Sequence, residues 1–237
     1  MQIRPEPLYR NAPFYFALLL LTALVGFFPS FYSRIGEAKF THLLHGGVAT
    51  LWMLLLIGQS WLVRQRQLRW HRAIGKASVL LVVLFAIGGV MIDHDMLTRS
   101  GGFAKAFGHR LFFLDMMATV YFVVAYALAI HNRHNVQLHA RFMASTALLL
   151  LPPALARVLG FYVLPEGSSF ALAFHLGFAI SSLVVLALML HDYHSGGKVR
   201  APYLILLAVM LVQQASYEVL PRLDAWMNFV GWLRSLS

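Results

Sequence analysis

The sequence predicts an all-α, polytopic membrane protein, and three observations lead to this prediction. The chain has 237 residues, of which 59% are hydrophobic and only 12% are charged, whereas a soluble domain carries about 25% charged residues. Seven apolar stretches are each long enough to cross the hydrocarbon core of a bilayer, which takes roughly 20 helical residues. The chain has no cysteine, so disulfides, thiolate metal sites and iron–sulfur clusters are excluded. This composition also excludes disordered and nucleic-acid-binding proteins, and it disfavours an ordinary soluble enzyme.

Each apolar stretch is expected to be a helix, because backbone groups in lipid must find hydrogen-bond partners within their own segment. The expected spans are residues 13–31, 42–63, 74–92, 108–130, 142–163, 169–190 and 202–220. Pro29 is expected to end the first span and Pro152 with Pro153 to kink the fifth, since proline removes a backbone donor and clashes with the preceding turn. The sequence therefore predicts a bundle of seven transmembrane helices.

The chain after residue 220 is too short and too polar to form another span. In residues 221–237, Trp226 and Trp232 alternate with charged residues, a pattern typical of an amphipathic helix that lies in the membrane interface. We therefore expect residues 1–237 to form a single transmembrane domain with this tail lying on its surface.

The basic residues indicate the orientation of the chain. An N-terminus in the cytoplasm places eleven Lys and Arg residues on the cytoplasmic side and seven on the other, and the positive-inside rule favours this arrangement. The loop from Arg64 to Lys76 carries most of the bias. The net charge of +10 is thus a topology signal, and the basic loops are expected to contact anionic lipid. We expect a multi-pass protein of the inner (plasma) membrane, with lipid and not nucleic acid as its partner.

A weak internal repeat relates three of the histidines. His45, His109 and His175 lie near the starts of the second, fourth and sixth spans, 64 and 66 residues apart. The chain is therefore expected to consist of one leading helix followed by three repeated hairpins. In membrane proteins, functional sites often lie where such copies meet.

Ionisable residues within the spans gather toward their outer ends. Asp115 lies about two turns inside the fourth span, Arg157 a similar distance from the outer end of the fifth, and Glu218 near the end of the seventh. A charged side chain inside the bilayer costs roughly 2.5–3.5 kcal/mol, so it usually faces a partner or a cavity. These three residues and the repeated histidines are expected to face one pocket, unless the charged residues only form structural ion pairs.

Two histidine pairs are candidate ligands of b-type haem. Haem takes two axial imidazoles from different helices and a flat apolar slot between them. His45 and His109 are expected at the same outer depth, and His71 and His139 at the same inner depth. Each pair is expected to hold one haem, and together they would carry electrons across the bilayer. Arg141 would then meet a haem propionate on the inner side.

A donor pocket would complete such a redox protein. The expected electron source is a quinol or another small-molecule donor, which binds beside the outer haem. Asp115, Arg157 and Glu218 are the expected catalytic residues, because ionisable groups there could take up the protons that the donor releases.

Two short motifs in the middle of the chain resemble a family of uncharacterised bacterial multi-pass membrane proteins. Leu68-Arg69-Trp70-His71-Arg72-Ala73-Ile74-Gly75 is similar to the family's His-Arg-x-x-Gly motif, and Leu138-His139-Ala140-Arg141-Phe142-Met143 is similar to its His-x-Arg-x-Met motif. By helix position, the chain also resembles the transmembrane di-haem b cytochromes that take electrons from ascorbate. In these, helices two and four hold one haem and helices three and five the other. That resemblance implies the same two histidine pairs.

Two other functional classes stay open. His45, His109 and His175, with Asp115 or Glu218, are also expected to suit zinc or iron with an open position for a reactive water. His175 discriminates between these predictions, because a bis-histidine haem leaves it unused whereas the metal site needs it. The third class is non-catalytic: a transporter, or an accessory subunit of a respiratory complex that binds another membrane protein or a second copy of this chain.

Overall fold

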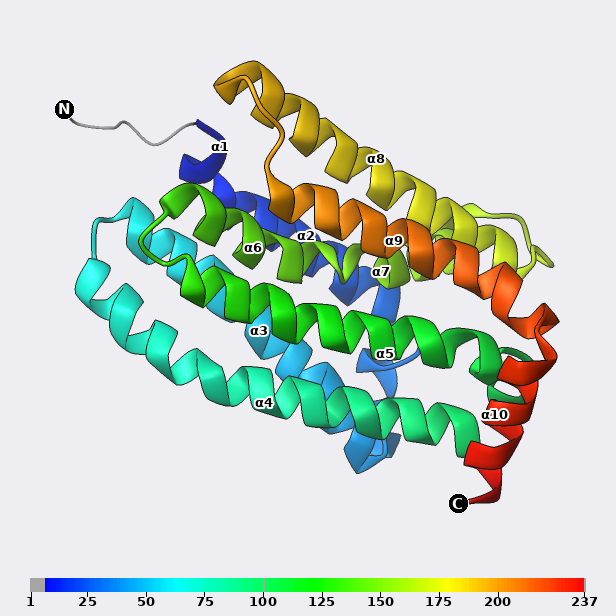
Figure 1. Cartoon of the computed structure of the whole chain (residues 1–237). Coiled ribbons are helices and arrows are strands. Elements are labelled where there is room, and N and C mark those ends of the chain that lie inside the picture. Colours follow the sequence, from blue (N-terminus) through cyan, green and yellow to red (C-terminus); the bar gives the residue numbers. More distant parts are fainter. Residues whose placement is uncertain (1–6, 100, 237) are drawn as a thin grey trace.

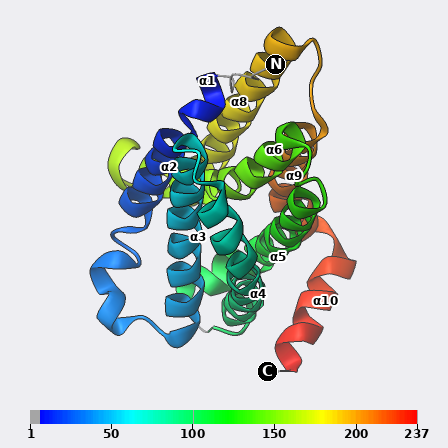
Figure 2. The ribbon, with the colours of Figure 1, turned by 90° about the vertical axis from the view of Figure 1, so that its left-hand side faces the viewer.

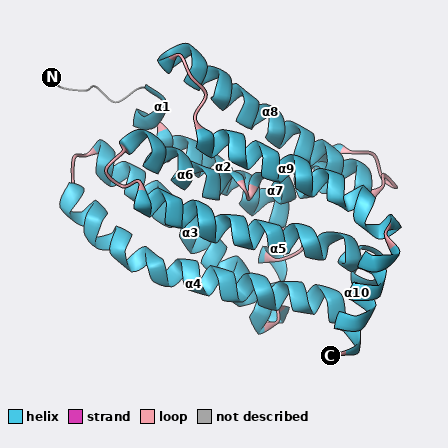
Figure 3. Ribbon diagram, viewed as in Figure 1, coloured by secondary structure: helices cyan, strands magenta, loops and turns pink. Residues whose placement is uncertain are grey.

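The structure is a computed structural model that describes residues 7–99 and 101–236. In this part of the chain the secondary structure is helical, without strands (Figure 3). The helices are α1 (Pro7–Arg10), α2 (Ala12–Phe27), η1 (Tyr32–Glu37), α3 (Phe40–Arg64), α4 (Leu68–Thr98), α5 (Gly102–His131), α6 (Val136–Leu148), α7 (Leu151–Val158), η2 (Leu159–Val163), α8 (Phe170–Gly196), α9 (Ala201–Val219), η3 (Leu220–Arg222) and α10 (Asp224–Ser235). The prediction of an all-α fold is confirmed.

Six helical segments in the described part are long and apolar enough to cross a membrane. They are Phe40–Arg64, Leu68–Thr98, Gly102–His131, Val136–Val163, Phe170–Gly196 and Ala201–Arg222. Large apolar side chains cover their outer surfaces, and Leu80 and Leu183 are each 64% exposed. Since extensive exposed apolar surface marks contact with something other than water, these helices suit a lipid bilayer. The first predicted span corresponds to α2, which is apolar but has only 16 residues.

The segment Val136–Val163 is broken in the middle, as its prolines predict. α6 ends at Leu148, two residues form a turn, and α7 begins at Leu151 with Pro152 in its first turn. A proline fits this position because the first N–H groups of a helix have no intrahelical partner. α7 then passes into η2, a single π-helical turn.

The long helices run side by side, with successive ones antiparallel (Figure 1). α3, α5 and α8 begin at the same end of the bundle, where α4 and α9 finish and where α10 lies; we call it the α10 end. The opposite end, which holds α1, is called the α1 end. Figure 2 shows the helices around a common core, with α10 at the margin.

Aromatic residues fill the middle of this core. Trp52 on α3 is 0% exposed and packs edge-on against Phe122 of α5, with ring centroids 4.9 Å apart. The Phe122 ring in turn stacks on Phe85 of α4 at 4.0 Å. The Trp52 indole N–H donates to the Thr146 hydroxyl on α6 at 3.0 Å. A buried indole needs such an acceptor, so this bond fixes α3 against α6.

The C-terminal tail forms a helix that docks across the α10 end. Trp226 donates from its indole N–H to the His109 carbonyl oxygen at 2.9 Å, and Arg234 donates from Nε to the Leu97 carbonyl oxygen at 3.1 Å. Val230 between them is 1% exposed. The carbonyl of Leu97 lies in the last turn of α4, where no further helical N–H can reach it. The tail therefore caps α4 and joins it to the start of α5.

Candidate functional site

Of the histidines predicted to bind haem, His71 and His139 lie next to each other, with their rings edge-on. They begin different helices, α4 and α6, at the α1 end of the bundle. Their ring centroids are 6.4 Å apart and their planes are inclined at 82°. An imidazole nitrogen lies about 2 Å from a metal that it binds, so two rings that hold one metal between them have centroids about 6 Å apart.

Each of these rings is held through its Nδ1. His139 donates from Nδ1 to the Ala129 carbonyl oxygen on α5 at 2.8 Å, and this bond leaves its Nε2 with a free lone pair. The Gln59 amide lies 2.5 Å from Nδ1 of His71 when its nitrogen also donates to the His71 carbonyl and its oxygen accepts from Gly75 N. A metal-binding imidazole normally donates from the nitrogen that does not bind the metal, as His139 does here. Nδ1 of His71 instead accepts from the Gln59 amide nitrogen.

The donor set at this place fits a b-type haem. Two neutral imidazoles from separate helices are the ligands that such a haem takes, and both are held by groups outside the space between them. The Gln59 amide would have to reverse its orientation if His71 bound iron through Nε2. In that state Nδ1 of His71 carries a proton, which it must donate to the amide oxygen. A turn of the amide about its last bond supplies that acceptor, but it gives up the hydrogen bonds of the amide to the His71 carbonyl and to Gly75 N.

Arg141 does not lie where a haem propionate could use it, contrary to the prediction. Its guanidinium is fully buried and pairs with the carboxylate of Asp192 on α8, which is also 0% exposed. Nε donates to Oδ2 at 2.7 Å, and Nη2 donates to Oδ1. The guanidinium also lies over the Tyr9 ring, 5.0 Å from its centroid. Arg141 therefore holds the α1 end together.

His45 and His109 do not lie at the same depth. A Cβ on Gly88 of α4 would lie 3.1 Å from the His45 Cα, whereas a Cβ on Gly108 would meet the Met96 carbonyl oxygen. Gly88 and Met96 are eight residues apart, which is about 12 Å along a helix. His45 packs on the Phe85 ring with centroids 5.1 Å apart, and its buried Nδ1 has no hydrogen-bond partner among the described residues.

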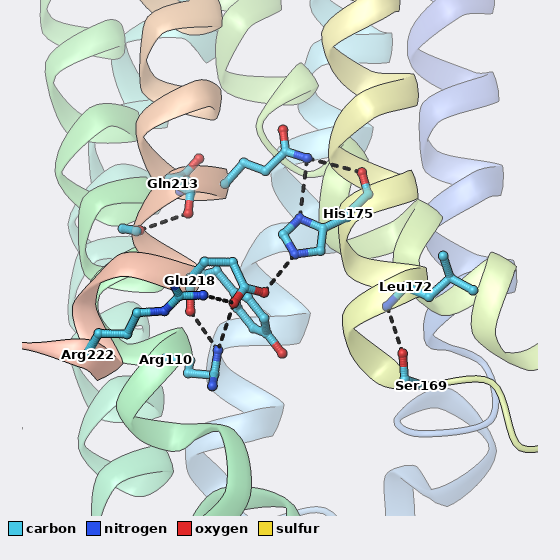
Figure 4. A network of polar contacts seen from close by, with 10 residues as sticks. Arg110, Ser169, Leu172, His175, Gln213, Glu218 and Arg222 are labelled. Carbon is cyan, nitrogen blue, oxygen red and sulfur yellow. Dashed lines mark hydrogen bonds and ion pairs between the residues drawn. The ribbon is translucent and has the colours of Figure 1, made fainter.

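His175 and Glu218 belong to a network that joins α5, α8 and α9 (Figure 4). Nε2 of His175 lies 3.1 Å from Oε1 of Glu218, and the Gln214 amide nitrogen donates to the His175 carbonyl oxygen at 3.3 Å. Arg110 lies 3.7 Å from the Glu218 carboxylate and donates to the Tyr217 carbonyl oxygen at 2.9 Å. Both residues are therefore paired, but the partners of Glu218 are His175 and Arg110 and not Arg157, the partner that the alternative of structural ion pairs predicts.

Asp115 and Arg157 lie together, and a third charged residue accompanies them. Arg157 donates from Nη1 to the Pro153 carbonyl oxygen at 3.0 Å, with its guanidinium 4.2 Å from the Phe27 ring centroid. The charges of Asp115 and Arg157 act on each other, and the charge of Asp115 also acts on Asp93 of α4. Sequence reasoning missed Asp93 because it placed the end of the third span at residue 92. The four-residue spacing of Gly89 and Asp93 could have indicated it, because residues four apart lie on the same face of a helix.

No three His, Cys, Asp or Glu side chains come close enough to hold a metal ion in the part of the chain that the structure describes. His45, His109 and His175 are thus not brought together: they contact Phe85, Trp226 and Glu218 respectively. Among the two predicted haem pairs, His71 and His139 are the one that the described part of the structure brings together, and His175 with Glu218 is another predicted neighbouring pair.

The fold and these sites define a multi-pass helical membrane protein. Comparison with known proteins adds no narrower class, because no family model, curated protein or solved structure matches this chain.

Proposed function

We propose that this chain is an integral-membrane redox protein that binds b-type haem between its helices, with His71 and His139 as the axial ligands. The observation that supports this most directly is the 6.4 Å separation of the two imidazole rings on separate helices. The haem would supply reversible one-electron transfer. The protein's own part is to hold two ring orientations, through the Ala129 carbonyl oxygen and the Gln59 amide.

One haem is proposed instead of the two that the sequence predicts. His45 and His109 differ in depth by about 12 Å of helix, which is too far for both to hold the same haem. The proposed electron source is a quinol or another small donor. Asp115 and Arg157 are better placed than Glu218 to take up the protons that the donor releases. The carboxylate of Glu218 is already paired with His175 and Arg110.

The proposal includes a finer topology. We infer that α2 is a seventh span, that the N-terminus is cytoplasmic in the inner membrane, that three hairpins follow α2, and that α10 lies in the interface. The resemblance of the two His-Arg motifs to the bacterial multi-pass family, and of the helix order to di-haem b cytochromes, belongs to the same proposal. A second membrane protein or another copy of this chain is the proposed protein partner.

A visible spectrum tests the haem assignment. The full chain, expressed with added haem precursor and purified in detergent, should show a reduced-minus-oxidised spectrum of b type. His71→Ala and His139→Ala should each lose that spectrum, because a single imidazole does not hold a low-spin haem. The matched control is His134→Ala, which removes an exposed histidine close to His139 and should leave the spectrum unchanged.

Metal analysis of the same preparations separates the alternatives. A b-type spectrum that survives both His71→Ala and His139→Ala would overturn the assignment of the ligands. Zinc or iron without porphyrin, lost on replacement of His45, His109 or His175, would favour the non-haem metal site. A preparation with neither haem nor metal would overturn the redox proposal in favour of a transporter or accessory subunit.

A further inference from the structure

Asp93 is a fully buried carboxyl group without a hydrogen bond. Its exposed fraction is 0%, and neither carboxyl oxygen has a hydrogen-bond partner among the described residues. Two residues further along α4, Asp95 behaves in the ordinary way: it accepts from the Thr41 hydroxyl at 3.1 Å and from Arg99 at 2.9 Å. An isolated charge in such surroundings costs so much that the group takes up a proton instead.

The packing of α4 on α5 places Asp93 opposite Asp115. These antiparallel helices pack closely at Gly89, where a Cβ would clash with the Thr119 side chain. Four residues further along α4 is Asp93, and four residues back along α5 is Asp115. Since residues four apart share a helix face, the two carboxyl groups follow the Gly89–Thr119 contact by one turn on the same interface.

Arg157 gives this pair a counter-charge. It reaches the pair from α7, and Asp115 is the carboxyl group whose charge acts on it. Two carboxylates and one guanidinium carry a net charge of −1, so one proton makes the group of three neutral. Two carboxyl groups that share a site hold one proton in preference to two charges.

We propose that Asp93 and Asp115 share one proton and form a proton-binding site inside the bundle, with Arg157 balancing the remaining negative charge. A proton fits this site better than a metal cation does. A metal would need a third acidic or imidazole ligand, and none is close enough in the described residues, while the Arg157 guanidinium would repel it.

The proton enters and leaves through Asp115. Asp93 is fully buried, whereas Asp115 and Arg157 are only half-buried. The α10 end is closed above Asp93 by Leu97, which is 5% exposed and whose carbonyl accepts from Arg234.

Other titratable groups near the site lie on elements packed against α4. On α3 they are His45, one turn away on the Gly88 side, and His42, which lies beside Asp95. On α5 the facing group is Asp115, and on α10 it is Arg234, bonded to Leu97. A signal from the proposed pair must therefore be separated from the titration of His42, His45 and Asp95.

Infrared difference spectroscopy of the full chain in proteoliposomes tests this site without relying on haem. At neutral pH the protein should show the carbonyl band of one protonated carboxyl group, which shifts on transfer to heavy water. Asp93→Asn should remove that band, and Asp115→Asn should remove or move it. Asp95→Asn is the matched control on the same helix, and it should leave the band in place.

Arg157→Gln gives the decisive result. Without the guanidinium, the second carboxylate loses its counter-charge, so both groups should be protonated and the band should approximately double. The proposal is overturned if the band survives both Asp93→Asn and Asp115→Asn, or if Arg157→Gln leaves its size unchanged. Each variant should elute from size-exclusion chromatography as a single species, which shows that a changed band does not come from misfolding. The infrared result does not depend on whether the protein binds haem.

Discussion

At the scale of single residues, the buried ion pair of Arg141 and Asp192 is the strongest constraint at the α1 end. Both side chains are 0% exposed and are joined by two hydrogen bonds. The removal of one partner from a buried pair leaves an uncompensated charge, which costs about 3–5 kcal/mol. Asp192→Asn and Arg141→Gln should therefore each destabilise the protein by about that amount, seen as a lower midpoint of thermal unfolding in detergent.

The double variant Arg141→Gln/Asp192→Asn should recover part of the loss, because it removes both charges together. Arg133→Gln provides the control, since Arg133 is exposed in the loop before α6 and surface charges contribute little. If Asp192→Asn behaves like Arg133→Gln, the ion pair does not stabilise the fold.

The prediction put Arg141 and Asp192 just outside the spans because the span limits were taken from hydropathy alone. The helices continue beyond their apolar runs: α4 reaches Thr98 and α8 reaches Gly196, about one to two turns past the predicted ends. Asp93 and Asp192 lie in these extensions. A window of mean hydropathy ends where charge begins, and it cannot show that the charge meets a partner on another helix.

At the scale of helices, close approach depends on small residues. A Cβ on Gly26 of α2 would lie 2.5 Å from the Ala154 carbonyl oxygen, and one on Gly177 of α8 would lie 2.8 Å from the Ala156 backbone nitrogen. Small residues at such positions let membrane helices pack backbone against backbone. α7, which carries Arg157, is held from both sides in this way.

The docking of α10 is a second feature at this scale, and it gives a testable difference between two tryptophans. Trp226 is half-buried and bonds the His109 carbonyl, whereas Trp232 is 55% exposed. Trp226→Ala should lower the stability by roughly 1–2 kcal/mol, through lost packing and one lost hydrogen bond. Trp232→Ala should change it by less than about 0.5 kcal/mol. Equal unfolding midpoints for the two variants would show that α10 is not docked in solution.

At the scale of the whole molecule, the fold class and the helix order follow from the sequence, whereas the site follows only in part. Six predicted spans and the proline break before α7 are present. His71 and His139 could be paired from their matching positions at the starts of two helices. Relative depth could not be predicted for His45 and His109, because it depends on how Gly88 and Gly108 set the register of neighbouring helices.

The number of spans is the remaining question at this scale, and α2 decides it. Its 16 residues cover about 24 Å at 1.5 Å per residue, which is somewhat less than the roughly 30 Å core of a typical bilayer. α1 precedes it by a single residue and adds length at one end. If α2 crosses, Arg10 and Gly36 lie on opposite sides of the membrane; if it lies within one leaflet, they lie on the same side.

Single cysteines can measure this directly, because the chain has none of its own. We expect a membrane-impermeant maleimide to label Gly36→Cys and Glu166→Cys from outside intact spheroplasts, and to label Arg10→Cys and Gln67→Cys only after permeabilisation. Arg10, Gln67 and Glu166 are exposed, and a side chain at Gly36 would meet nothing within 4 Å, so the label should reach each position. Gln67 lies in the loop that carries most of the positive charge, so it reports the orientation independently of α2. Labelling of Arg10→Cys and Gly36→Cys from the same side would leave six spans, and external labelling of Gln67→Cys would reverse the orientation of the bundle.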